Sequence, residues 1–137
     1  MASDRSIPVL NDHEVEAAAD MATLIAVCDA AVVAAASGEL ISPPRHVVGF
    51  GSGQLVFTAG GNDRAIGFRA YDTFPDSKQD QVVAVWHPSS GRLAGVIVGE
   101  MLGAFRTGAL GGVGIDRMAA PDAHSCAVIG TGLQART

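Results

Sequence analysis

A glycine-rich run near the end of the chain has the spacing of a dinucleotide-binding turn. It reads Gly130-Thr131-Gly132-Leu133-Gln134-Ala135, which fits the pattern GxGxxA. In such a turn the first glycine makes the tight bend, the second lets backbone approach a pyrophosphate, and the third small residue lets the helix pack on its strand. The phosphate then lies at the helix N-terminus, where unpaired amides and the helix dipole favour negative charge. The pattern alone is weak evidence, and a plain glycine loop stays an equal alternative.

A basic pair, Arg106-Thr107, lies in a segment from Met101 to Ala119 that is predicted to be a helix although it holds five glycines. Each glycine costs about 0.8–1 kcal/mol relative to alanine, or about 4–5 kcal/mol together. Such a helix persists only where tertiary contact offsets that cost, so we expect another backbone or a ligand to approach it closely. By itself, Arg106 would more often be a solvated helix residue than a functional one.

The elements expected ahead of this segment begin with two helices. An apolar run over residues 7–10 predicts a strand that leads into a helix capped at Asn11-Asp12. A second helix is expected from Asp20 to a stop at Gly38. Its apolar face would consist of Leu24, Val27, Cys28, Ala31, Val32 and Ala35.

Strands are expected through the middle of the chain. Two prolines at 43 and 44 exclude a helix and present Arg45 from a stiff loop or the start of a strand. Residues 47–48 and 55–58 predict strands, and 60–63 predicts a turn. Apolar runs over 82–86 and 93–98 predict a hairpin closed by the turn at 88–91. Phe57 and Trp86 are expected in the core.

The strand expected between Ala65 and Phe74 has two different faces. Ile66, Phe68 and Ala70 share an apolar face, whereas Arg69, Tyr71 and Thr73 share the other. We interpret the apolar face as core and the other as a candidate site. Arg69 and Tyr71 could equally lie on the wet face of an edge strand.

This order of elements predicts an α+β domain followed by the start of an α/β domain. We expect residues 1–120 to form an N-terminal domain of helices and a mixed or antiparallel sheet. Residues 121–137 would then form the first strand, from His124 to Ile129, and the glycine turn of a truncated Rossmann domain. At 137 residues, two complete domains are not expected.

Composition limits the class of protein. Hydrophobic residues make up 48% of the chain and charged residues 17%, which is typical of a globular protein. A net charge of -5 without a basic run argues against nucleic acid and anionic membranes as partners, although local arginines can still bind small anions. No signal-peptide core or membrane-length apolar run is found, so we expect a cytoplasmic protein. The four histidines show no metal-ligand spacing.

Several short motifs together resemble the ornithine cyclodeaminase and mu-crystallin family. They are Gly38 with Pro43-Pro44-Arg45, Gly67-Phe68-Arg69, Ser90-Gly91-Arg92-Leu93-Ala94, Phe105-Arg106-Thr107-Gly108-Ala109, and Val128-Ile129-Gly130-Thr131-Gly132-Leu133-Gln134-Ala135. The resemblance runs from about Asn11 to Thr137 and corresponds to roughly the first two-fifths of a member.

The resemblance implies an enzyme that uses NAD or NADP on a small amino or imino acid. Family reactions include ornithine cyclisation to proline with loss of ammonia, ketimine reduction and amino-acid dehydrogenation. It implies that Arg45, Arg69 and Arg106 bind the substrate carboxylate, and that Arg106 and Thr107 also lie near the cofactor. The pyrophosphate would face Gly130, Gly132, Gln134 and Ala135. It further implies a homodimer.

Two departures from the family limit this expectation. Arg69 stands where cyclodeaminases carry a lysine, and an arginine cannot serve as a neutral amine near neutral pH. The family's catalytic aspartate would lie beyond Thr137, so the catalytic residues are unknown and this stretch is expected to be inactive alone. We also expect it to self-associate through sheet edges and an apolar helix face. The alternative is a non-catalytic module that binds a small carboxylate or dimerises.

Overall fold

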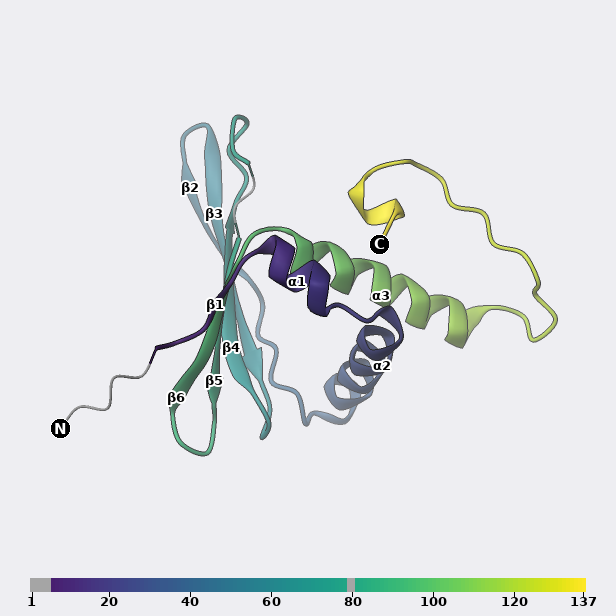
Figure 1. The fold of residues 1–137 in the computed structure, drawn as a ribbon, viewed down its shortest axis with the longest axis horizontal. Coiled ribbons are helices and arrows are strands. Elements are labelled where there is room, and N and C mark those ends of the chain that lie inside the picture. The colour runs from purple at the N-terminus through teal and green to yellow at the C-terminus, as the bar shows by residue number, and fades with distance from the viewer. Residues whose placement is uncertain (1–5, 79–80) are drawn as a thin grey trace.

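The computed structural model describes residues 6–78 and 81–137 and shows one sheet with helices on a single face (Figure 1). The strand order is β1-β6-β5-β4-β3-β2. The strands are β1 (Val9–Leu10), β2 (His46–Phe50), β3 (Gly53–Gly61), β4 (Ile66–Asp72), β5 (Gln81–His87) and β6 (Arg92–Val98). Neighbouring strands are antiparallel except β1, which runs parallel to β6. The prediction of helices with a mixed sheet is confirmed.

The first two helices begin and end where their capping residues predict. α1 (Asp12–Ala18) has a capping box, in which the Asn11 side chain accepts from the Glu14 amide and the Glu14 side chain accepts from the Asn11 amide. α2 (Met21–Ser37) begins after Asp20, whose carboxylate accepts from the Thr23 amide at 2.9 Å. It ends at Gly38, where φ is 80° and an L side chain would be strained.

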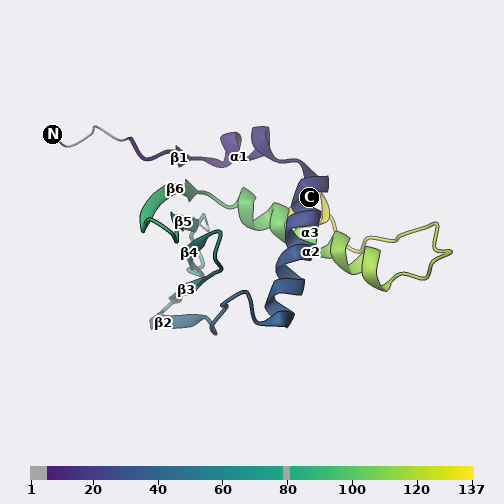
Figure 2. The same cartoon turned by 90° about the horizontal axis from the view of Figure 1, so that it is seen from below.

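The third helix, α3 (Met101–Met118), crosses α2 on the helical side of the sheet (Figure 2). A Cβ on Gly112 would come within 2.8 Å of Ile25 Cδ1, so this glycine permits the close approach of α2. The expected close approach of another backbone is found at Gly108, where an added Cβ would meet the Thr137 carbonyl, whereas the neighbour of Gly112 is a side chain. No close approach is found at Gly111 and Gly114, where an added Cβ would meet open space.

The core between these layers is small, and the outer face of the sheet is bare. The apolar residues buried there are Val15, Val56, Ala104, Ala109 and Val113, whereas the buried Ala84 pairs with Phe68 and lies on the other face of the sheet. On the outer face, large apolar side chains are 36% to 42% exposed at Phe57, Ile66, Phe68, Val82 and Val98. The register places these side chains on one face, because directly paired residues point to the same side.

Three predictions about buried side chains are therefore wrong for this chain. The strand face with Ile66 and Phe68 is not core, because these side chains are 42% and 39% exposed. Phe57 and Trp86 do not lie in a core: Phe57 is exposed, and Trp86 is half-buried beside Phe68, with 5.8 Å between the ring centroids. The reason is that no layer formed by the described residues covers the outer face of the sheet. The apolar face predicted for α2 is also only partly correct, since Val27 and Val32 are 60% and 48% exposed.

The segment after α3 departs most from the sequence prediction. No strand forms from His124 to Ile129, and the segment extends away from the sheet before it returns to α3 (Figure 1). A strand needs a neighbour to pair its amides and carbonyls, and this segment has no partner strand in the described chain. After the glycine run there is a three-residue 3-10 turn, η1 (Leu133–Ala135), where a helix was expected.

Among residues 6–78 and 81–137, no single helix is long and apolar enough to cross a bilayer. α1 and α2 together would meet the length and composition, but they are bent by 93° at the break between them.

Candidate functional site

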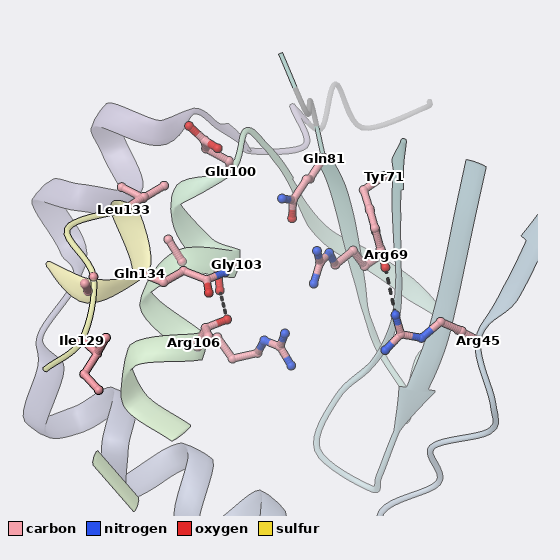
Figure 3. Close-up of a pocket in the computed structure, with 15 residues that line it drawn as sticks. Arg45, Arg69, Tyr71, Gln81, Glu100, Gly103, Arg106, Ile129, Leu133 and Gln134 are labelled. Atoms are coloured by element: carbon pink, nitrogen blue, oxygen red, sulfur yellow. Dashed lines mark hydrogen bonds between the residues drawn. The ribbon is translucent and has the colours of Figure 1, made fainter. Parts of the chain in front are cut away.

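A pocket of about 610 Å³ lies between the helical face of the sheet, α3 and the C-terminal turn (Figure 3). The sheet side contributes Arg45, Arg69, Tyr71 and Gln81. α3 and its first turn contribute Glu100, Gly103, Ala104, Arg106 and Thr107, and the C-terminal segment contributes Ile129, Gly130, Gly132, Leu133, Gln134 and Ala135. Every substrate-binding or cofactor-binding residue that the family resemblance implies lines this one pocket, whereas Thr73, from the candidate face of the strand, does not.

Arg69 lies in the middle of the pocket wall. β4 is flanked by β3 and β5, so the alternative of an edge strand is excluded. Its guanidinium carbon lies 4.4 Å from the ring centroid of Tyr71, and its buried Nε has no hydrogen-bond partner. Burial lowers the pKa of Arg69, nearby Arg106 and Arg45 lower it further, and Tyr71 acts in the opposite direction. The guanidinium stays charged, because an arginine side chain is not deprotonated in proteins.

Arg45 also lines the pocket, from the loop that directly precedes β2. It is exposed and directly precedes β2, after the two prolines, as the sequence predicts. Its Nη1 donates to the Tyr71 hydroxyl at 3.1 Å. Tyr71 thus contacts two guanidinium groups at once, one through its ring and one through its hydroxyl.

Arg106 and Thr107 enter the pocket from α3. The exposed Arg106 side chain reaches from the helix toward Arg69 (Figure 3). The Thr107 hydroxyl donates to the Gly103 carbonyl at 2.8 Å, one turn earlier in the helix. Thr107 therefore offers a ligand its hydroxyl oxygen as an acceptor, because its proton is already engaged.

The glycine run lies opposite α3. Gly130 has φ of 114°, which only glycine adopts readily, and a Cβ on Gly130 or Gly132 would meet no atom within 4 Å. The turn is held on α3 by Thr137, whose hydroxyl donates to the Ala104 carbonyl at 3.2 Å. The open backbone suits a pyrophosphate, but the strand and long helix that would orient it are not formed in this chain.

The pocket gathers positive charge. In the described part of the chain the recorded ion pair is Arg117 with Asp29, and no carboxylate pairs with Arg45, Arg69 or Arg106. Glu100 is the carboxylate among the lining residues. No group of three His, Cys, Asp or Glu side chains that could hold a metal is found among the described residues. The arrangement is suited to bind a small anion.

Sequence reasoning missed two polar lining residues, Gln81 and Glu100. Tyr71 was placed on the candidate face with Arg69 by the two-residue period of the strand, but no specific role followed from that. Gln81 pairs with Tyr71 in the register between β4 and β5, which cannot be read from sequence. Glu100 directly precedes α3 and gave no signal of its own.

Comparison with protein families decides the identity of this fold. The model of the ornithine cyclodeaminase/mu-crystallin family matches residues 6–137. The chain belongs to this family. No curated protein matches it significantly in sequence.

Solved structures with the same fold include several enzymes. An archaeal alanine dehydrogenase dimer with bound NAD has a TM-score of 0.87 and 22% identity, covering 95% of this chain and 42% of its own. The Thermococcus litoralis pyrroline-2-carboxylate reductase, in complex with NADH and L-proline, has a TM-score of 0.83 and 21% identity, covering 95% and 43%. The Paracoccus denitrificans iminosuccinate reductase, in complex with NAD+, has a TM-score of 0.77 and 21% identity, covering 87% and 40%. The chain thus spans less than half the length of these enzymes.

Proposed function

We propose that this chain supplies the substrate-binding part of an NAD(P)-dependent enzyme acting on a small amino or imino acid. The reaction would be dehydrogenation, ketimine reduction or cyclisation with loss of ammonia. The observation that supports this is the convergence of Arg45, Arg69 and Arg106 on one pocket that also holds the glycine run. Domains at 1–120 and 121–137, and a cytoplasmic location, belong to the same proposal.

In this proposal the arginines bind and orient the substrate carboxylate. Arg69, stacked on Tyr71, presents a fixed planar fork, and Arg45 is held beside it by the Tyr71 hydroxyl. Charge-assisted, bidentate bonds of this kind fix orientation as well as position. Nicotinamide, when bound, would supply or accept the hydride. Gly130, Gly132, Gln134 and Ala135 would face its pyrophosphate, with Arg106 and Thr107 nearby.

Chemical-shift mapping by NMR tests the proposal on the chain itself. Butyrate is expected to perturb the amides around Arg69 and Tyr71, whereas butyramide, which lacks the charge, is not. NADH is expected to perturb Gly130 and Gly132. Butyrate signals that persist in Arg69→Gln, or NADH signals confined to other parts of the chain, would contradict it.

We also expect no cofactor-dependent turnover from the 137-residue chain with ornithine, proline or ketimines. Of the lining residues that the structure describes, Glu100 is the one with an ordinary proton-accepting carboxylate, and oriented hydride transfer needs a positioned cofactor. Cofactor-dependent turnover above that of a blank without the chain would show this expectation to be wrong.

A second role, dimerisation, is favoured by the bare outer face of the sheet. Phe57, Phe68 and Trp86 lie there among aliphatic neighbours, and large contiguous apolar faces mark interaction sites. We therefore propose a homodimer that pairs two sheets through this face. On this role alone, the chain would be a non-catalytic binding or dimerisation module.

A further inference from the structure

The charge of the pocket bears on the class of substrate. Among the described lining residues, three guanidinium groups face one carboxylate, that of Glu100, which leaves two positive charges uncompensated within that set. Glu100 lies at the first turn of α3, at the end of the pocket away from Arg45 (Figure 3). A simple amino acid is a zwitterion, so it brings no net charge and leaves this excess as it is.

Burial makes the excess costly. The Nε of Arg69 is buried and has no partner in the structure. Arg69 is half-buried, so leaving its charge short of hydrogen bonds and counter-charge is unfavourable, and the charges of the exposed Arg106 and Arg45 add repulsion. A ligand with two negative groups would supply the missing hydrogen-bond acceptors and counter-charge, and it would also reduce the repulsion among the three guanidinium groups.

The space around the arginines can hold two such groups. Arg69 and Arg106 line both the main pocket and a smaller chamber of about 250 Å³ between the sheet and α3. Thr58, Val83 and Leu102 also line this chamber, and among its described lining residues there is no carboxylate. Arg69 reaches in from the sheet and Arg106 from the helix, so two carboxylates of one ligand can meet arginines from different elements (Figure 3).

We propose that the substrate of this site is a dicarboxylate, an amino or imino diacid, with one carboxylate held by Arg45 and Arg69 and the other by Arg106. This inference rests on the proposed function, because it assumes that the pocket binds a substrate carboxylate. A diamino acid is disfavoured, because its second ammonium would enter a space walled by guanidinium groups.

Succinate and butyrate test the inference, since they have the same number of carbon atoms and differ in the second carboxylate. Titration calorimetry of the 137-residue chain, at matched ionic strength and at a pH where both acids are fully ionised, compares them. A second charge-assisted interaction corresponds to about ten- to a hundredfold tighter binding of succinate. Arg106→Gln should weaken succinate binding by a larger factor than butyrate binding, so that the two acids bind with about equal affinity.

Arg92→Gln is the matched control. It removes the same charge from an exposed position at the start of β6, outside both chambers, so the succinate preference should persist. Equal affinity for the two acids, lost in Arg69→Gln, would overturn the dicarboxylate inference and leave the proposed carboxylate site standing. If neither acid binds, both the dicarboxylate inference and the proposed carboxylate site are overturned. If circular dichroism shows that Arg106→Gln does not fold, the ratio of succinate affinity to butyrate affinity in the unchanged chain tests the inference.

Discussion

The carboxylate of Asp12 accepts a hydrogen bond from the backbone amide of Met101 at 2.9 Å, although 89 residues separate them. It also accepts from the Glu100 amide at 3.3 Å. Glu100 itself gives α3 no side-chain cap, so a residue of α1 caps the helix that carries Arg106. These hydrogen bonds hold the N-terminus of α3 against α1, near the beginning of the chain.

Asp12→Ala is expected to destabilise the chain by about 1–2 kcal/mol, because the first amides of α3 lose their acceptor. Asp12→Asn should retain most of the stability, since its amide oxygen can accept the same bonds. Urea denaturation measures both, with the exposed Glu16→Ala in the same helix as control. A loss in Asp12→Ala no greater than that in Glu16→Ala would show that the cap contributes nothing.

An ion pair between Asp29 and Arg117 connects α2 to the end of α3, and its contribution to stability should depend on pH. Arg117 donates to Asp29 through Nε at 3.0 Å and Nη2 at 2.6 Å. The hydrogen bond from Arg117 lowers the pKa of Asp29 from its ordinary value of 3.8. A carboxylate with a lowered folded-state pKa adds stability above its unfolded pKa and loses it as the pH falls through the folded value.

Thermal unfolding of Asp29→Asn measures that dependence. The variant should melt below the unchanged chain at neutral pH, and the difference should shrink as the pH falls below about 4. The effect should be small and should weaken in salt, because the pair is partly exposed. A difference that stays constant down to acid pH would show that the ion pair does not cause it.

Local signals in the sequence were sufficient for most of the secondary structure. Asn11, Asp20 and Gly38 set helix ends through bonds to their own neighbours, so their roles can be read without tertiary structure. The strand period placed Arg69 and Tyr71 on one face for the same reason. Capping by Asp12 could not be read, because it depends on how α1 lies against α3.

Errors occurred where an element depends on a partner. Phe57 and Trp86 have core side chains, but their burial requires a layer that the described chain does not provide. The run from His124 to Ile129 has the residues of a strand, but a strand forms only against a neighbour. The convergence of the arginines was not readable from composition or spacing, and it came from the family resemblance.

Tyr71 should position the arginines as well as line the pocket. Tyr71→Phe removes the hydroxyl that accepts from Arg45 but keeps the ring against Arg69. A net hydrogen bond of about 0.5–1.5 kcal/mol predicts a two- to tenfold loss of butyrate affinity. Tyr71→Ala also loses the cation–π contact and should bind more weakly still. Calorimetry measures both, with circular dichroism as a check of folding; equal affinity in all three chains would exclude this role.

The last prediction concerns the bare face of the sheet. Phe68 is 39% exposed near its centre and contacts Trp86, so an arginine there would place an unpaired charge inside a sheet-to-sheet interface. Light scattering should report a dimer for the unchanged chain at micromolar concentration and a monomer for Phe68→Arg. Met118→Arg is the control, because Met118 is also apolar, is 85% exposed and lies on α3 away from the sheet. A dimer lost in Met118→Arg and kept in Phe68→Arg would place the interface on the helices, and a monomeric unchanged chain would exclude the proposed dimer.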